Sequence, residues 1–135
     1  MTLQINSIHF IMNDFIKWEP IITPIPKDLY FVCLSDSKGI LTIRLAEMED
    51  NKVLEFKIKG VMAYRVVDEG ARLKTLYENP SYRRFVASDN SSYLKWFHME
   101  SREMFEDWGL KHYSIGNINN IIDIICGSDI VVKWK

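Results

Sequence analysis

The sequence is poor in the residues and motifs from which cofactor, metal and phosphate sites are built. Its 135 residues include two cysteines, three histidines and six scattered glycines. Neither GxGxxG nor GxxxxGKS, the glycine-rich loops that hold phosphates, occurs. HExxH and the GxSxG turn that presents a nucleophilic serine are also absent. We therefore expect no cofactor, no metal and no enzyme activity.

The nearest match to a metal motif is His98-Met99-Glu100, which has the H-x-E half of the zinc deaminase signature. The P-C-x-x-C half is missing, so a histidine on a helix surface is the simpler interpretation. For His112 we expect a hydrogen-bonded, half-buried position in a sheet. An enzyme remains an alternative hypothesis, with His98, Glu100 and His112 as its catalytic group.

The cysteines Cys33 and Cys126 each lie within an apolar run. Free cysteine is among the most frequently buried residue types, which favours two buried thiols in a reducing compartment. One disulfide between them is the alternative.

Charge of one sign and long apolar runs are also lacking. Seventeen basic residues against 18 acidic ones give a net charge of −1, whereas a dedicated nucleic-acid binder usually shows a basic excess. No apolar run reaches the length of a membrane span. No basic residue precedes Lys17 and Asp14 interrupts the apolar stretch, unlike a signal peptide. We expect a cytoplasmic chain with no nucleic-acid partner and no membrane partner.

The length suits a single domain spanning residues 1–135. Residues 1–28 are the least patterned part. Three prolines within seven positions, Pro20, Pro24 and Pro26, disfavour a helix there. This segment is predicted to be an N-terminal arm or loop, with a short helix or strand near Ile8–Trp18.

The remaining pattern predicts an α+β fold. Apolar or alternating segments predict strands at 29–34, 40–46, 54–59, 61–67, 110–115 and 130–134. Helical spacing with capping residues predicts helices within 68–79, 91–108 and 117–126. The simplest packing is a mainly antiparallel sheet of about five or six strands, with three helices on one face.

The predicted helix 91–108 is the most informative element. Its expected buried stripe consists of Leu94, Phe97, Ser101, Met104, Phe105 and Trp108. The opposite side carries Trp96, Glu100, Glu103, Glu106 and Asp107. Acids near a helix C-terminus are unfavourable, and local exceptions of this kind often mark functional sites. These five residues are the predicted surface for a basic protein partner; the alternative is compensation of the acids by Arg65 or Arg83.

Three segments support a resemblance: VMAYRVVDEGARLKTL (61–76), SYLKWFHMES (92–101) and LKHYSIGNINNIIDIICGSDIVVKW (110–134). They resemble small bacterial immunity or orphan proteins encoded beside polymorphic toxins of contact-dependent inhibition and Rhs systems. The resemblance implies binding to a cognate toxin domain, such as a basic nuclease, and blocking of its active site. The near-neutral charge departs from the strongly acidic immunity proteins.

Two further functions remain open. Seventeen aromatic residues could line a pocket in a module that binds a small ligand or a peptide. A structural or oligomer-forming role is the other, and the oligomeric state is open.

Overall fold

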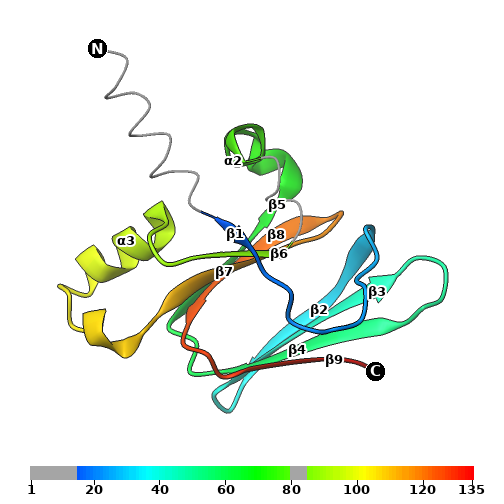
Figure 1. Ribbon diagram of the computed structural model, residues 1–135, viewed down its shortest axis with the longest axis horizontal. Helices are drawn as coiled ribbons and strands as arrows, with labels where there is room; N and C mark the ends of the chain where they lie inside the picture. Colours follow the sequence, from blue (N-terminus) through cyan, green and yellow to red (C-terminus); the bar gives the residue numbers. More distant parts are fainter. Residues whose placement is uncertain (1–14, 80–84) are drawn as a thin grey trace.

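The computed structural model describes residues 15–79 and 85–135 and has an α+β fold with two antiparallel sheets (Figure 1). The five-stranded sheet has the order β1 (Ile16–Lys17), β6 (Phe85–Ser88), β7 (Lys111–Gly116), β8 (Asn120–Cys126) and β5 (Ala63–Asp68). The four-stranded sheet has the order β2 (Leu29–Ser37), β3 (Ile40–Glu47), β4 (Val53–Lys59) and β9 (Ile130–Trp134). The helices are η1 (Glu69–Ala71), α2 (Leu73–Glu78), α3 (Ser92–Glu100) and η3 (Glu106–Trp108).

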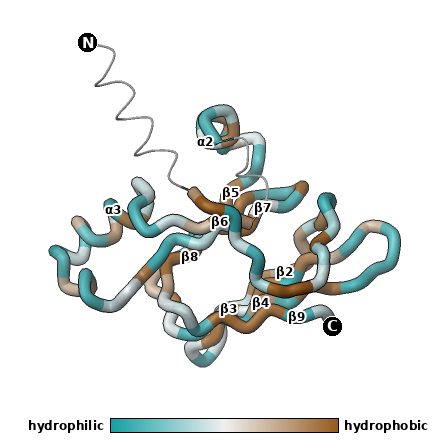
Figure 2. The backbone as a smooth tube through the Cα atoms, in the orientation of Figure 1, coloured by the Kyte–Doolittle hydropathy of each residue, from teal (hydrophilic) through white to brown (hydrophobic). Residues whose placement is uncertain are grey.

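The main core lies between the two sheets. Alternation along β3 and β4 buries Ile43 and Phe56 on one face of the four-stranded sheet. These side chains pack with Ile115 and Ile122 of the five-stranded sheet. Figure 2 shows hydrophobic segments on strands of both sheets. The predicted strands 40–46 and 54–59 are confirmed as β3 and β4, which pair antiparallel.

The first described residues contribute to this core. The core is extended by the side chains of Trp18, Ile21 and Ile25. The backbone N–H of Trp18 donates to the Phe85 carbonyl at 2.9 Å. The described part of the predicted N-terminal segment, residues 15–28, is therefore packed into the domain. Within it, only β1 is regular secondary structure. Residues 1–14, including most of the predicted element near Ile8–Trp18, lie outside the described residues.

Both described α-helices pack on the five-stranded sheet. Leu94 and Phe97 of α3 contact Ile125 of β8. Leu76 of α2 contacts Ile121. The interior strand β8 is covered by these helices on one face and by the core between the sheets on the other, and all its residues after Asn120 are buried.

The predicted helix at 117–126 is wrong, because its residues form the turn before β8 and β8 itself. A strand covered on both faces has no polar alternation, so its isoleucines fit a helical spacing equally well. Strand β6 was not predicted. Within the described residues there are nine strands and two α-helices, against the five or six strands and three helices expected.

The predicted helix 91–108 is shorter than expected, because α3 ends at Glu100. The Arg102 N–H donates to the Met99 carbonyl at 3.0 Å, and the Glu103 N–H donates to the His98 carbonyl at 2.8 Å. These two bonds form a Schellman motif with Arg102 in the left-handed region at φ 53°. Glycine usually holds that position, so the sequence contained no conspicuous stop signal.

Candidate interaction surface and its supporting network

Helix α3 and the segment after it, residues 92–108, form an arm at one side of the two sheets (Figure 1). The arm exposes four large apolar side chains, with exposed fractions of 48% for Trp96, 72% for Met99, 73% for Met104 and 61% for Trp108. The predicted burial of Met104 and Trp108 is therefore wrong. Because the chain leaves the helix after Glu100, the helical spacing no longer directs these two side chains toward the sheet.

The four acids of the predicted partner surface, Glu100, Glu103, Glu106 and Asp107, are all exposed. None of them forms an ion pair with another residue of the described ranges. Arg65, offered as a compensating base, binds Asp123 instead, and Arg83 lies outside the described residues.

The helix-dipole argument is wrong for two of the four acids, although Glu100 does lie at the C-terminal end of α3. Glu106 and Asp107 belong to the first turn of η3, where negative charge is favourable. The arm therefore combines unpaired negative charge with exposed apolar side chains.

Trp96 is the best supported of the exposed apolar side chains. Its ring stacks on Tyr93 with centroids 5.7 Å apart and planes 4° apart. The guanidinium of Arg65 lies over the same Tyr93 ring, 4.1 Å from its centroid. Stacking and cation–π contacts of this kind each contribute about 0.5–1.5 kcal/mol. They restrict the orientation of Trp96 although the side chain is half exposed.

Beneath the arm lies a buried carboxylate, Asp123, with an exposed fraction of 0%. Arg65 Nε donates to Oδ2 at 2.9 Å, and Arg72 Nη1 donates to the same oxygen at 2.6 Å. His112 Nε2 lies 2.7 Å from Oδ1. Three groups from different parts of the chain thus bind one carboxylate.

Burial alone would raise the pKa of Asp123. The hydrogen bond from His112 and the charges of His112, Arg65 and Arg72 act in the opposite direction and hold the pKa well below its usual range. Asp123 is therefore ionised in the folded protein.

The network continues to the start of α3. His112 Nδ1 lies 2.7 Å from Ser91 Oγ, and this oxygen accepts the N–H of Leu94 at 3.1 Å as the N-cap of the helix. Because the Asp123 carboxylate can only accept, Nε2 donates to it, and Nδ1 forms the hydrogen bond with the Ser91 hydroxyl. Asp123 therefore supports the arm at two points, the helix N-cap and Tyr93 beneath Trp96.

Ser91, His112 and Asp123 are the residue types of a hydrolytic triad. Ser91 is only 2% exposed, however, and its oxygen is engaged by the helix N-cap. A nucleophile must reach its substrate, so this line of hydrogen bonds fits a structural role in positioning α3. Sequence reasoning did not find it. The available signal was Asp123, an acid within an isoleucine run.

The three residues of the alternative catalytic group do not come together among the described residues. His112 is fully buried, rather than half-buried as expected, at an exposed fraction of 1%. Glu100 is exposed at the end of α3. His98 lies on the same helix, and no hydrogen bond or ion pair with a described residue joins it to either of them.

A hollow of about 400 Å³ lies beside Trp96. The rings of Tyr64, Tyr93 and Trp96 line it, together with Met62. Asp36 is also part of its wall and accepts a hydrogen bond from the Tyr64 hydroxyl at 3.4 Å. The hollow thus offers aromatic surface and a carboxylate next to the arm.

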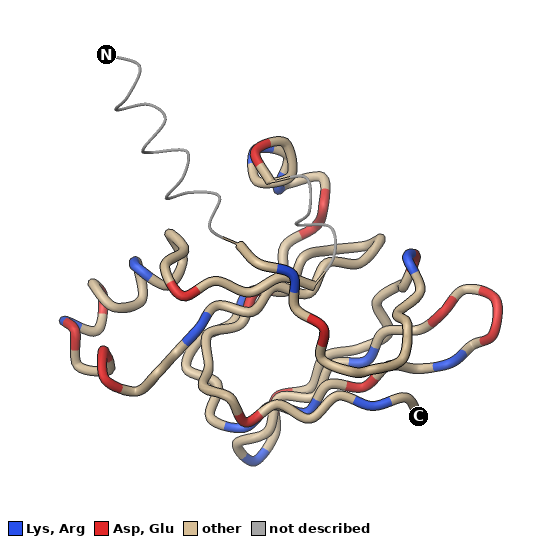
Figure 3. Tube along the Cα trace, in the orientation of Figure 1, with Lys and Arg blue, Asp and Glu red and all other residues tan. Residues whose placement is uncertain are grey.

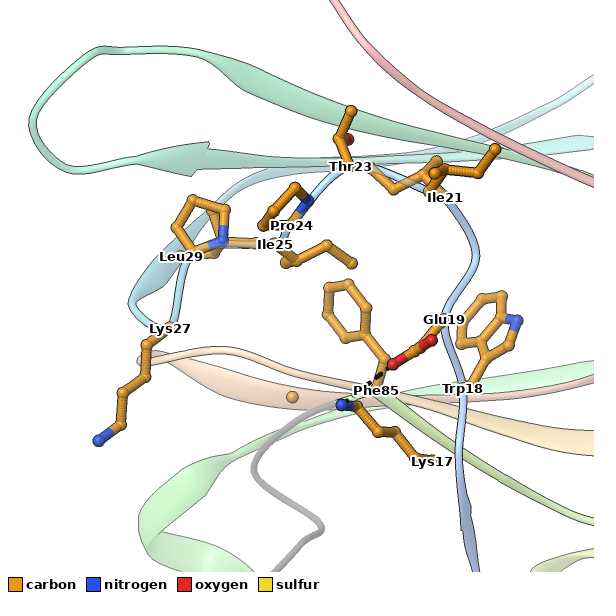
Figure 4. A pocket seen from close by; sticks show the side chains of 13 residues that line it. Lys17, Trp18, Glu19, Ile21, Thr23, Pro24, Ile25, Lys27, Leu29 and Phe85 are labelled. Atoms are coloured by element: carbon orange, nitrogen blue, oxygen red, sulfur yellow. Dashed lines mark ion pairs between the residues drawn. The ribbon is translucent and has the colours of Figure 1, made fainter.

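A separate cavity of about 300 Å³ lies beneath the loop between β1 and β2 (Figure 4). Trp18, Ile25 and Phe85 form apolar walls, and Lys27 lies at its edge. Lys17 pairs with Glu19 there at 3.0 Å.

The two cysteines are free. Cys126 is buried, and its burial, with the nearby charge of Asp129, raises the thiol pKa to about 12. Cys33 is partly exposed. In residues 15–79 and 85–135 no group of three or more His, Cys, Asp or Glu side chains is arranged to hold a metal ion. No helix in the same ranges is long and apolar enough to cross a membrane.

Comparison of the chain with protein-family models, curated proteins and solved structures finds no match.

Proposed function

We propose that this chain is a cytoplasmic protein-binding domain that neutralises a cognate toxin domain, as immunity proteins do. The observation that supports this function is the arm. Between Trp96 and Trp108 it exposes four large apolar side chains and four carboxylates without a described ion-pair partner. Large apolar side chains beside charge that the protein does not neutralise are typical of an interface with another macromolecule.

The partner suited to this surface is a basic protein, such as a nuclease domain. Its cations would pair with Glu100, Glu103, Glu106 and Asp107, which would accelerate association and orient the complex. Trp96 would act as an anchor, because interface hot spots are enriched in tryptophan with restricted motion. The hollow beside Trp96 can accept one side chain of the partner.

The direct test is co-expression with the protein encoded immediately upstream, followed by purification and a growth assay. We expect a stable complex and protection of the cells from that protein. Replacing Trp96 with Ala should weaken the complex by about 2 kcal/mol or more, the typical cost at a hot spot. Ile118→Ala, at another exposed apolar residue, is the matched control. Neither complex nor protection would refute the proposal.

The cavity of Figure 4 favours a second candidate function, which is binding of a small apolar ligand or of an apolar side chain of a peptide. Its volume of about 300 Å³ is at the lower end of the range for ligand sites. Titration with indole should shift the NMR signal of the Trp18 indole N–H. Ile25→Trp, which fills the cavity, should abolish that shift, whereas Met48→Trp in an exposed loop should not. An equal shift in both variants would exclude the cavity as the site.

A further inference from the structure

The outer face of the four-stranded sheet carries an excess of positive charge. Strand alternation places Lys57 and Lys59 of β4 on the face opposite the core residues Phe56 and Ile58. On β9 the same alternation separates Lys133 from the half-buried Val132 and Trp134 that pack against the core. Lysines from two neighbouring strands therefore share one face.

The strand register makes these residues neighbours. Arg44 of β3 lies opposite Glu55 of β4, and Glu55 lies opposite Lys133 of β9. Lys57 lies opposite Val131. Lys135 follows β9, and its Nζ is 3.7 Å from Glu55. We call the five cations Arg44, Lys57, Lys59, Lys133 and Lys135 the basic face.

The charge of the basic face differs from that of the whole chain. Five cations, Glu55 and the exposed Asp129, whose backbone carbonyl accepts the N–H of Lys59, give a local charge of +3. Since the chain as a whole carries −1, its remaining side chains carry −4. Figure 3 shows lysine and arginine along the strands of this sheet and acids grouped in loops beside it. This face is thus positive although the chain as a whole is nearly neutral.

Glu55 organises part of this face. It is 1% exposed and pairs with Arg44 Nε at 2.9 Å and with Lys135 at 3.7 Å. Lys57, Lys59 and Lys133 form no ion pair within the described ranges and are all exposed. Three lysines are therefore available to an external anion.

We propose that the basic face docks on the surface of an anionic phospholipid bilayer. A bilayer presents mobile phosphate groups over a broad surface, so the cations need no matching spacing. Both described α-helices pack on the other sheet, so neither of them covers this face. Val131, 55% exposed between the lysines, can contact the headgroup region.

Two features favour a bilayer over a nucleic acid. Four of the five cations are lysines, which are point charges and lack the bidentate fork of arginine. The exposed apolar side chain of Val131 gains nothing against a phosphate backbone. Neither whole-chain charge nor the lack of an apolar span reveals such a face, which is why the sequence predicted no membrane partner.

The experiment is vesicle co-sedimentation of the full chain. Vesicles of phosphatidylcholine alone are compared with vesicles that also contain phosphatidylglycerol. We expect binding only to the anionic vesicles, reversed by added salt. The triple variant Lys57→Gln, Lys59→Gln, Lys133→Gln should bind about a hundredfold more weakly, since each lysine near an anionic surface contributes roughly a factor of five. It retains Arg44 and Lys135, which pair with buried Glu55.

The control variant Lys27→Gln, Lys74→Gln, Lys95→Gln removes the same charge from exposed lysines elsewhere. It should bind anionic vesicles nearly as well as the unmodified chain. Absence of binding, or an equal loss in both variants, would overturn the proposal. Tighter binding of duplex DNA than of anionic vesicles would assign the face to nucleic acid and overturn it too. Because both variants retain the acidic side chains and Trp96 of the arm, the outcome is independent of the proposed toxin binding.

Discussion

The protein contains carboxylates in two contrasting situations. Asp123 is fully buried and bound by Arg65, Arg72 and His112, all within 2.9 Å. The carboxylates of the arm, such as Glu106 and Asp107, are exposed and unpaired among the described residues. A buried ionised group requires its partners, whereas an exposed one is solvated by water. Asp123 should therefore determine the stability of the fold. The exposed carboxylates of the arm should determine association with a partner.

The largest effect is expected for Asp123→Asn. It removes the buried negative charge that Arg65, Arg72 and His112 bind. Breaking a buried ion pair in this way costs about 3–5 kcal/mol. Urea unfolding should show that the free energy of unfolding falls by this amount. Asp107→Asn is the matched control, and its change should stay within about 0.5 kcal/mol. A loss below about 1 kcal/mol for Asp123→Asn would show that the network contributes little.

The pH dependence of stability should follow from the same group. The pKa of Asp123 is lowered in the folded state, so its contribution is complete above the unfolded value of about 3.9. It is lost as the pH falls through that value toward the lower folded pKa. Urea midpoints measured between neutral and strongly acidic pH should therefore fall more steeply for the unmodified chain than for Asp123→Asn. Parallel curves would contradict this assignment.

A smaller effect is expected for Arg65→Met, which removes one bond to Asp123 and the cation–π contact on Tyr93. Because the Arg65 side chain is 40% exposed, we expect a loss of about 1–2 kcal/mol, toward the lower end for a bond to a charged group. The variant should also increase the mobility of Trp96, measured by NMR relaxation of its indole N–H. Unchanged relaxation would mean that the network does not hold Trp96.

The variant Arg102→Gly should raise the free energy of unfolding by about 0.5–1 kcal/mol. Glycine adopts the left-handed conformation at the end of α3 without the steric cost that residues with a side chain incur there. Arg102→Ala retains that cost and should give no gain. Thermal unfolding of the two variants measures the difference. Equal midpoints would argue against the Schellman motif and against the short α3.

The sequence predicted the parts of the fold in which one face meets water. Leu41, Ile43 and Leu45 alternate with polar residues, and this pattern identified β3 correctly. Strand β8 has no such pattern because both of its faces are covered, so Ile121–Ile125 was assigned to a helix. Long-range partners were equally hidden. Arg65 and Asp123 meet across 58 positions, and nothing in either segment indicates the other.

The arm shows the same limit at a functional site. Its five predicted surface residues are all exposed, including Trp96, but the helix-dipole reason given for the acids fails for Glu106 and Asp107. The helix ends earlier than its periodicity suggests, because Arg102 adopts a conformation that sequence patterns assign to glycine. The exposure of Met104 and Trp108 follows from that early end and adds apolar surface that the sequence did not predict.

We expect the arm carboxylates to act in association with a partner and not in the stability of the fold. The most direct measurement is the association rate of the protein encoded upstream with the chain and with its variant Glu103→Gln, Glu106→Gln, Asp107→Asn, across a range of salt concentrations. We predict an unfolding free energy within about 0.5 kcal/mol of the unmodified chain and an association rate lowered mainly at low salt. An unchanged rate at low salt, or a large loss of stability, would contradict the account.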